Sequence, residues 1–231
     1  KEFATAGANV QVWSMERSHA LHTFEWGSDT VLSVRYNPVE TDIFASCGSD
    51  RSIALYDVRM QTPLKKIIMQ TKSTKLCWNP MEAFNFTVAN EDTNLYSYDM
   101  RKLDIATCVH KDFVSAVMDI DYSPTGREFV AGSYDRTVRM FDYNAGHSKD
   151  CYHTKRMQRV FCTRFSMDGS YVFSASDDMN VRCWKADASA QMGTLSAAEK
   201  KNAEIERARS LRKLFETFAA DDVKDPFGFG V

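Results

Sequence analysis

The feature that most constrains this sequence is an internal repeat of 42 or 43 residues. An aromatic residue recurs at that spacing five times, and an aspartate follows it directly in three of the repeats. The five aromatic positions are Trp13, Tyr56, Tyr98, Phe141 and Trp184. A constant spacing of this length indicates that each repeat is one structural unit and that neighbouring units bury a common core.

Two kinds of turn subdivide each repeat. An aspartate lies six residues before each of the last four aromatics, at Asp50, Asp92, Asp135 and Asp178. The flanking Gly, Ser and Asn residues favour a tight hairpin there. A second turn has the form aromatic-Asn/Ser-Pro at 36–38, 78–80 and 122–124, and Met167 replaces the proline at 165–167. Between the turns, apolar and polar residues alternate, which predicts strands.

Short strands with turns about every ten residues, repeated at this period, predict an all-β fold of the WD-repeat β-propeller type. We expect a half blade at 1–14 and blades at about 22–58, 66–101, 109–143 and 152–186, which together make a partial propeller over 1–190. Because the usual ring has about seven blades, we expect these four to five blades to be its C-terminal part, with further blades preceding this stretch.

The repeat stops after Trp184, and a short α-helix is predicted at 191–218. Ser196 and Glu199 have the spacing of a capping box, and apolar residues follow at helical spacing. The helix is basic, with Lys200, Lys201, Arg207, Arg209, Arg212 and Lys213. It is expected to dock on another surface, with packing against the last blade as an equal alternative. Residues 219–231 are expected to form an irregular tail.

Composition limits the classes of partner. The chain has 29 Lys and Arg against 31 Asp and Glu, a formal charge of −2, so any contact with phosphate must come from a local patch. No apolar run reaches about 18 residues, so no membrane-spanning helix and no membrane partner are expected. The N-terminal residues lack the features of a signal peptide. Six cysteines without a C-x-x-C pair favour a reducing cytosolic or nuclear compartment.

Two histidines invite a catalytic interpretation. His110 precedes Asp135 by 25 residues, and His153 precedes Asp178 by the same spacing. A His–Asp pair can be part of a catalytic triad. Because the pair recurs from repeat to repeat, a structural hydrogen-bond network within each blade is the better prediction.

Other enzyme and metal signatures are missing from the sequence. Cys151, His153 and Cys162 provide too few ligands at suitable spacing for structural zinc. There is no phosphate-binding loop, nucleophile elbow or H-E-x-x-H helix. We therefore expect no catalytic residue, no metal, no cofactor and no small-molecule substrate.

Two Asp-x-Arg sequences follow strand aromatics, at Asp57–Arg59 and Asp99–Arg101. Each arginine is expected at a blade edge, where its planar guanidinium can pair with an acidic partner protein. An ordinary solvated charge is the alternative. The predictions leave both possibilities open.

A basic loop is predicted at 153–159, with Lys155, Arg156 and Arg159. Together with the basic helix, it is a candidate contact for RNA phosphate or for protein. A solvated loop is the alternative.

Several segments go beyond the generic repeat and resemble the Sof family of WD-repeat proteins. They include 77–86, 99–104, 114–117 and 152–158, and the resemblance extends over about 1–215. After about 215 the strongly basic extension of that family is absent.

The resemblance implies a nucleolar, and hence nuclear, protein of the small-subunit processome. Such a protein works beside the U-three small nucleolar ribonucleoprotein in maturing small-subunit ribosomal RNA. Its implied partners are proteins of a large ribonucleoprotein assembly, with contacts to pre-rRNA or snoRNA through local basic patches. The resemblance also implies an alternative role as a substrate receptor of a cullin-RING ubiquitin ligase, with Arg59 and Arg101 matching the motif that contacts the ligase adaptor.

Overall fold

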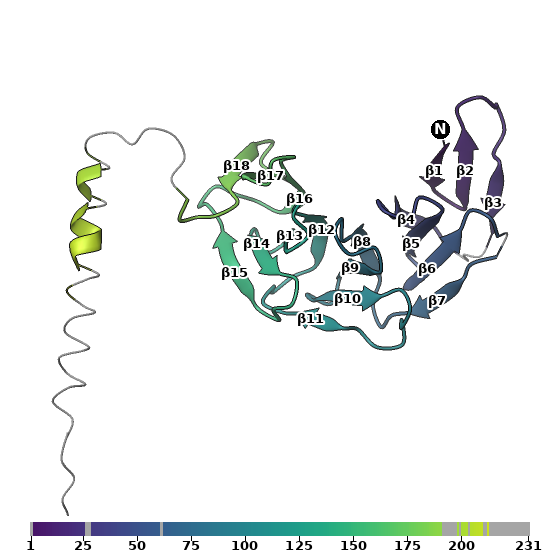
Figure 1. Ribbon diagram of the computed structural model, residues 1–231, viewed down its shortest axis with the longest axis horizontal. Helices are drawn as coiled ribbons and strands as arrows, with labels where there is room; N and C mark the ends of the chain where they lie inside the picture. Colours follow the sequence, from purple (N-terminus) through teal and green to yellow (C-terminus); the bar gives the residue numbers. More distant parts are fainter. Residues whose placement is uncertain are drawn as a thin grey trace, which may run out of the picture. The chain divides into compact units, whose positions relative to one another are not determined.

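The structure is a computed structural model that describes residues 2–25, 29–60 and 62–190, together with 198, 200–202, 204–209 and 212. The chain divides into two compact units, 1–188 and 189–231. The described residues of the first unit form five antiparallel sheets, each built from strands that follow one another in the sequence (Figure 1). From residue 198 onward, the described residues are helical.

The strands of the five sheets have the following bounds. The first sheet contains β1 (Glu2–Ala6), β2 (Val10–Ser14) and β3 (His22–Phe24). The second contains β4 (Val31–Tyr36), β5 (Ile43–Gly48), β6 (Ser52–Asp57) and β7 (Lys65–Ile68). The third contains β8 (Ser73–Trp78), β9 (Asn85–Asn90), β10 (Leu95–Asp99) and β11 (Cys108–His110). The fourth contains β12 (Val117–Tyr122), β13 (Glu128–Ser133), β14 (Val138–Asp142) and β15 (Ser148–Tyr152). The fifth contains β16 (Val160–Phe165), β17 (Tyr171–Ser176) and β18 (Val181–Lys185).

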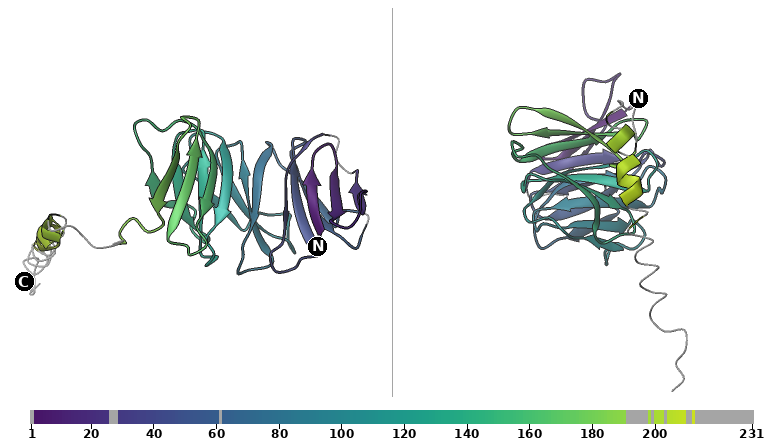
Figure 2. Two further views of the ribbon diagram at one scale, coloured as in Figure 1. Left: turned by 90° about the horizontal axis from the view of Figure 1, so that it is seen from above. Right: turned by 90° about the vertical axis from the view of Figure 1, so that its left-hand side faces the viewer.

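The sheets of the first unit stand side by side, as the view from above shows (Figure 2). Their first strands lie innermost: β8 packs against β4 on one side and β12 on the other, and β12 packs against β16. This radial arrangement confirms the predicted all-β propeller with stacked blades.

In the three four-stranded blades, the aromatic residues that define the repeat are buried in the core. In three blades the aromatic of the third strand lies directly opposite a phenylalanine of the second strand, and the two rings stack. The pairs are Phe44–Tyr56 with ring centroids 4.9 Å apart, Phe86–Tyr98 at 5.8 Å and Phe129–Phe141 at 5.4 Å. Such pairs contribute about 0.5–1.5 kcal/mol beyond the area they bury. The spacing of 42 or 43 residues is therefore the spacing of core positions.

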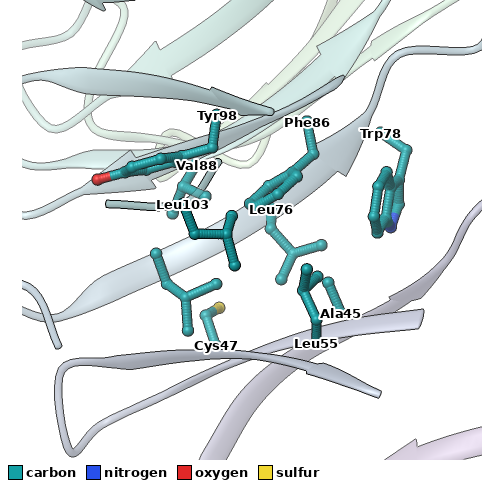
Figure 3. Packing of buried hydrophobic residues seen from close by; sticks show 10 residues of the cluster. Ala45, Cys47, Leu55, Leu76, Trp78, Phe86, Val88, Tyr98 and Leu103 are labelled. Atoms are coloured by element: carbon teal, nitrogen blue, oxygen red, sulfur yellow. The ribbon is translucent and has the colours of Figure 1, made fainter. Parts of the chain in front are cut away.

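The cores continue from one blade into the next. Leu55 and Cys47 of the second sheet pack against Leu76, Phe86 and Val88 of the third (Figure 3). All five side chains are buried. Burying a side chain such as Leu76 stabilises the fold by about 1.5–3 kcal/mol. One blade alone would leave this surface in water, so the blades stabilise one another.

The predicted blade boundaries are wrong, because the prediction assigned each outer strand to the blade that follows it in the sequence. β7 is hydrogen-bonded to β6, so the blade predicted at 66–101 begins with the outer strand of the preceding sheet. The same offset applies at β11 and β15, and the half blade predicted at 1–14 gains β3. The full blades run from 31 to 68, 73 to 110 and 117 to 152. The period fixes the length of a repeat, but the pairing of the outer strand decides which sheet that strand joins.

Part of the predicted helix at 191–218 is described. Residues 200–202 and 204–209 are helical, and the side chains of Lys200, Lys201, Arg207, Arg209 and Arg212 are exposed. Ser196, Glu199, Lys213 and the predicted tail at 219–231 lie outside the described residues. No helix within the described part of the chain is both long and apolar enough to span a bilayer.

Candidate interaction surfaces

The antiparallel strands place the predicted contact residues at opposite ends of the blades. β6 and β10 end at Asp57 and Asp99, on the end that also carries the aromatic-Asn-Pro turns. We call this end the arginine face. β15 runs antiparallel to β14 and ends on the other side, where residues 153–159 connect it to β16. We call this opposite end the basic-loop face.

On the arginine face, Arg59 follows the end of β6, and its guanidinium does not pair with the aspartate of its own motif. Its backbone N–H donates to Asp57 Oδ1 over 2.9 Å, while its guanidinium pairs with Asp42 at the start of the neighbouring strand. The Arg59 side chain is 76% exposed. An exposed ion pair of this kind contributes little stability, so the guanidinium can exchange Asp42 for another carboxylate.

Arg101 is held more firmly by its own motif. Its Nη2 lies 2.7 Å from Asp99 Oδ2, and its Nε lies 3.0 Å from Asp99 Oδ1. The guanidinium carbon also lies 4.4 Å from the ring centroid of Phe84. The hydrogen bonds from Arg101 lower the pKa of the Asp99 carboxyl. The two Asp-x-Arg motifs therefore present their arginines differently, and Arg101 is the more rigid of the two.

A hollow of about 430 Å³ lies on the same face, at the ends of the innermost strands. Pro38, Pro80 and Pro124 of the repeated turns line it together with charged residues. Among the latter, Arg164 Nη1 donates to Asp121 Oδ1 over 2.8 Å. Burial raises the pKa of Asp121 despite that hydrogen bond. The lining of the hollow thus combines the apolar prolines of the repeated turns with the ion pair of Arg164 and Asp121.

On the basic-loop face, the predicted loop is anchored from within. Met157 is buried, and its N–H donates to Thr154 O over 3.0 Å. The carbonyl of Arg159 accepts the N–H of Asp177 over 2.9 Å. Lys155 and Arg156 lie between these anchors and are exposed. The backbone that carries the basic side chains is therefore fixed by the fold.

Two aromatic residues next to this loop were missed by the sequence analysis. The guanidinium carbon of Arg159 lies 5.4 Å from the ring centroid of Tyr134, and Tyr134 meets Phe161 edge to face at 5.8 Å. Tyr134 directly precedes the turn residue Asp135, where the equivalent turns carry Ser49, Glu91 and Asp177. An aromatic residue at that turn position was the signal that could have revealed the site.

The predicted pairing of His110 with Asp135 is wrong. His110 is fully buried, and its Nδ1 donates to Ala145 O over 2.6 Å, while its Nε2 lies 2.9 Å from Ser97 Oγ. Asp135 instead organises its own turn by accepting from the N–H and Oγ1 of Thr137. The two residues belong to different sheets, because β11 is the outer strand of the preceding blade.

His110 ends a buried chain of hydroxyl groups. Since Nδ1 donates to Ala145, the neutral ring accepts from Ser97 through Nε2. Ser97 in turn lies 2.8 Å from Thr87 Oγ1, which lies 2.5 Å from the hydroxyl of Tyr122 in the next blade. Burial lowers the pKa of His110. These hydrogen bonds join neighbouring strands and blades, and Asp135 is not among their partners.

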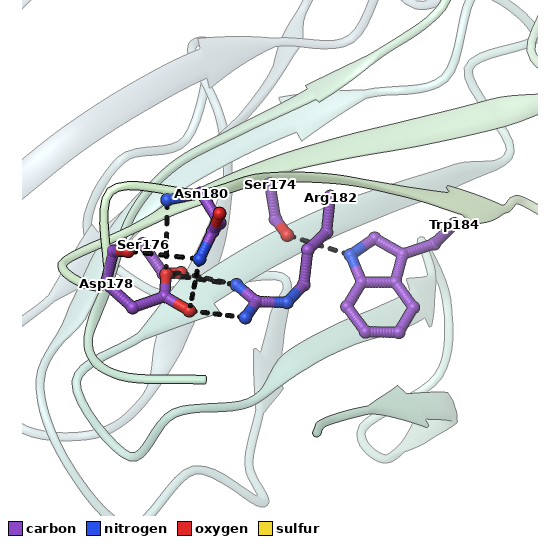
Figure 4. A network of polar contacts seen from close by, with 6 residues as sticks. All are labelled: Ser174, Ser176, Asp178, Asn180, Arg182 and Trp184. Carbon is purple, nitrogen blue, oxygen red and sulfur yellow. Dashed lines mark hydrogen bonds and ion pairs between the residues drawn. The ribbon is translucent and has the colours of Figure 1, made fainter. Parts of the chain in front are cut away.

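The second predicted pair, His153 with Asp178, is also wrong. His153 is exposed on the basic loop. Asp178 is bound by Arg182, Ser176 and Asn180 in its own hairpin (Figure 4). The hydrogen bond from Arg182 is the main cause of the lowered pKa of Asp178. An arginine of the same blade has therefore taken the place expected for the histidine.

Metal ligands do not cluster in the part of the chain that the structure describes: no group of three or more His, Cys, Asp or Glu side chains lies close enough to hold an ion. The cysteines are free thiols. Burial raises the pKa of Cys47 to about 12 and that of Cys77 to about 11, which disfavours the nucleophilic thiolate form of both residues.

Radial four-stranded blades, Asp-centred hairpins and polar faces at both ends define an interaction protein of the WD-repeat class. The family described as "WD domain, G-beta repeat" matches residues 18–57, 105–142 and 148–185, and the chain belongs to this family.

Individual relatives are more informative than the repeat itself. The chain is 58% identical to "DDB1- and CUL4-associated factor 13" of Danio rerio over 198 residues, which cover 86% of this chain and 44% of that protein. It is 51% identical to the Homo sapiens protein of the same name, with the same coverage. It is 50% identical to "Protein SOF1" of Saccharomyces cerevisiae over 204 residues, 88% of this chain and 42% of that protein. The resemblance to the Sof family is thereby confirmed, and the chain spans less than half the length of these relatives.

Proposed function

We propose that this protein is a non-catalytic scaffold in ribosome biogenesis, a component of the small-subunit processome that supports pre-rRNA processing and maturation of the small ribosomal subunit. The observation that carries the proposal is its 50% identity to the yeast protein SOF1 over 88% of the chain. We place it in the nucleus and nucleolus, among proteins of a large ribonucleoprotein assembly, with contacts to pre-rRNA or snoRNA through local basic patches.

The geometry supports a scaffold because contact residues occupy both ends of the blades. The arginine face offers Arg59 and Arg101 to acidic protein surfaces, and the basic-loop face offers Lys155, Arg156 and Arg159. Two partners can therefore bind at once without competing for the same surface. The histidines that suggested catalysis do not support it, since His110 is buried and engaged in structural hydrogen bonds.

Sedimentation of tagged protein from cell extract tests the proposal. The tagged chain is expected in fractions that contain large pre-ribosomal particles and small nucleolar RNA. A variant with both Arg59→Ala and Arg101→Ala is expected to shift toward lighter fractions if the arginine face holds a partner of the assembly. Migration of the unaltered protein only as a free monomer would contradict the proposal.

A second candidate function is that of a substrate receptor of a cullin-RING ubiquitin ligase. It is favoured by the animal relatives, whose printed name associates them with DDB1 and CUL4, and by the two Asp-x-Arg motifs of the arginine face. Pull-down with DDB1 is the test, using Arg59→Ala with Arg101→Ala and, as a control for the loss of one positive charge on the same face, Arg127→Ala. Equal capture of all variants would exclude the two motif arginines as the contact.

A further inference from the structure

The basic-loop face carries a surface that combines aromatic rings with basic side chains. We call it the aromatic–basic patch and define it by Tyr134, Lys155, Arg156, Arg159 and Phe161. Phe161 lies on the innermost strand β16, yet the residue is 43% exposed. The rings of Tyr134 and Phe161 are perpendicular with centroids 5.8 Å apart, and the guanidinium carbon of Arg159 lies 5.4 Å from the centroid of the Tyr134 ring. The ring of Phe161 is thereby fixed on one side and open to solvent on another.

The basic side chains of the patch are available for an anionic ligand. The ion pairs recorded among the described residues include none with Lys155, Arg156 or Arg159. The seven residues 153–159 contain no carboxylate. Because buried Met157 and the backbone hydrogen bonds fix the loop, little conformational entropy is lost when it binds.

The combination of an open aromatic ring with unpaired cations fits one class of ligand best. Unstacked bases pack on aromatic side chains, and the phosphates between them pair with Lys and Arg. An acidic protein surface would engage the cations but would make no use of the ring face of Phe161. Double-stranded RNA would not expose its bases for stacking.

We propose that the aromatic–basic patch binds single-stranded RNA, with a base stacked on Phe161 and neighbouring phosphates held by Lys155 and Arg156. Arg159 supports the platform by its position over Tyr134 and adds a third positive charge. The inference deepens the proposed function, since it assigns the RNA contact of a ribosome-assembly scaffold to specific side chains.

A carboxylate beside the basic loop gives a sharper test. Asp177 is exposed, and its N–H donates to the carbonyl of Arg159, so its negative charge lies near the basic loop. It would repel a phosphate bound there. Asp177→Asn removes this charge and is therefore expected to strengthen RNA binding. If the patch does not bind RNA, the substitution is expected to leave the RNA affinity of the chain unchanged.

The experiment is fluorescence anisotropy of a labelled oligouridine of about 12 nucleotides with the purified full chain. Phe161→Ala and Phe161→Leu are each expected to weaken binding about fivefold or more, because leucine keeps the bulk but not the ring face. Lys155→Ala with Arg156→Ala is expected to weaken binding and to reduce the slope of log affinity against log salt by roughly 0.7 for each lost phosphate contact. Arg127→Ala, on the opposite face, is the control for the loss of one positive charge and is expected to bind as the unaltered chain does.

Each alternative outcome is informative. If Phe161→Leu binds as tightly as the unaltered chain while the Lys155 and Arg156 variant does not, the loop is a general polyanion site and the proposal is overturned. If polyglutamate binds and RNA does not, the patch is a protein contact and the proposal is again overturned. Thermal melting of each variant shows whether it is folded. Absence of RNA binding at the patch would not contradict the scaffold role, since sedimentation tests that role separately.

Discussion

The side-chain amide of Asn79 donates a hydrogen bond to the carbonyl oxygen of Gly126 over 3.0 Å and thereby joins two neighbouring blades. The other end of the same side chain, Oδ1, accepts the N–H of Met81 over 2.9 Å within its own turn. Asn37 repeats both interactions one blade earlier, with Ala83 O at 2.7 Å and the N–H of Val39 at 2.9 Å. The aromatic-Asn-Pro turn is thus a contact between blades as well as a turn.

Removal of this contact should destabilise the propeller. Asn79→Ala is expected to lower the free energy of unfolding by about 1–3 kcal/mol, because it leaves buried backbone groups without hydrogen-bond partners. Urea denaturation measures the loss. Asn144→Ala is the control: this asparagine is exposed in a neighbouring turn, and its replacement is expected to change stability by less than about 0.5 kcal/mol. Equal effects of the two changes would contradict the role of Asn79.

The glycine on the other side of the contact should be equally restricted. Gly126 has φ of 68°, and a Cβ there would lie 2.5 Å from Asn79 Oδ1 and 2.7 Å from Met81 Cβ. Gly126→Ala is expected to cost about 1–3 kcal/mol for the left-handed backbone alone, with the clash in addition. Gly7→Ala is the matched control, because a Cβ at Gly7 meets no atom within 4 Å. A melting temperature of Gly126→Ala close to that of the control would show that the turn can rearrange.

The two histidines should differ in their effect on stability. His110→Ala removes the end of a buried hydrogen-bond chain and is expected to lower the free energy of unfolding by about 1–3 kcal/mol or more. His153→Ala alters an exposed loop residue and is expected to change it by less than about 0.5 kcal/mol. Thermal melting of both variants is the measurement. A large loss of stability in His153→Ala would support the pairing of His153 with Asp178 that the sequence predicted.

Stability should fall on mild acidification because of His110. Its pKa is lowered in the folded protein by burial, while in the unfolded chain it titrates near about 6.5. Between the folded and unfolded pKa values the unfolded state binds more protons, so the free energy of unfolding decreases as the pH falls below about 6.5. A proton on Nε2 would also prevent it from accepting the hydrogen bond of Ser97.

Urea midpoints at pH about 7.5 and about 5.5 measure this dependence. His110→Gln is expected to lose much of the decrease, since glutamine does not titrate, while His153→Gln is expected to keep it. If His110→Gln shows the same decrease as the unaltered chain, another group is responsible.

Several elements were predictable because they depend on short stretches of chain. Alternating side chains specify strands, and Asp-centred turns specify hairpins, as at Asp50 and Asp178. The stacked pair of Phe86 and Tyr98 follows from the same local rule, since a hairpin of fixed length brings those positions opposite each other. The fold class was therefore predictable from the period and from the turns.

The candidate site was only partly predictable. The basic loop and the two Asp-x-Arg motifs are visible in the sequence, but the partner of Arg59 is Asp42, 17 residues away. Tyr134 and Phe161 come from different blades, and neither carries a sequence signal for binding by itself. Their meeting depends on how the fourth and fifth sheets pack.

The sequence by itself determined that this protein is built of repeated antiparallel sheets and where their hairpins turn, because strand alternation and turn chemistry act over about ten residues. The tertiary structure alone decided which sheet each outer strand joins, which partner His110 binds, and that Asp-x-Arg motifs and basic loop lie on opposite faces. Those features depend on pairings that local rules do not specify. His110 binds Ser97 and Ala145, 13 and 35 residues away, and the outer strand β7 pairs within the preceding sheet, so strand alternation and turn chemistry over about ten residues could not reveal them.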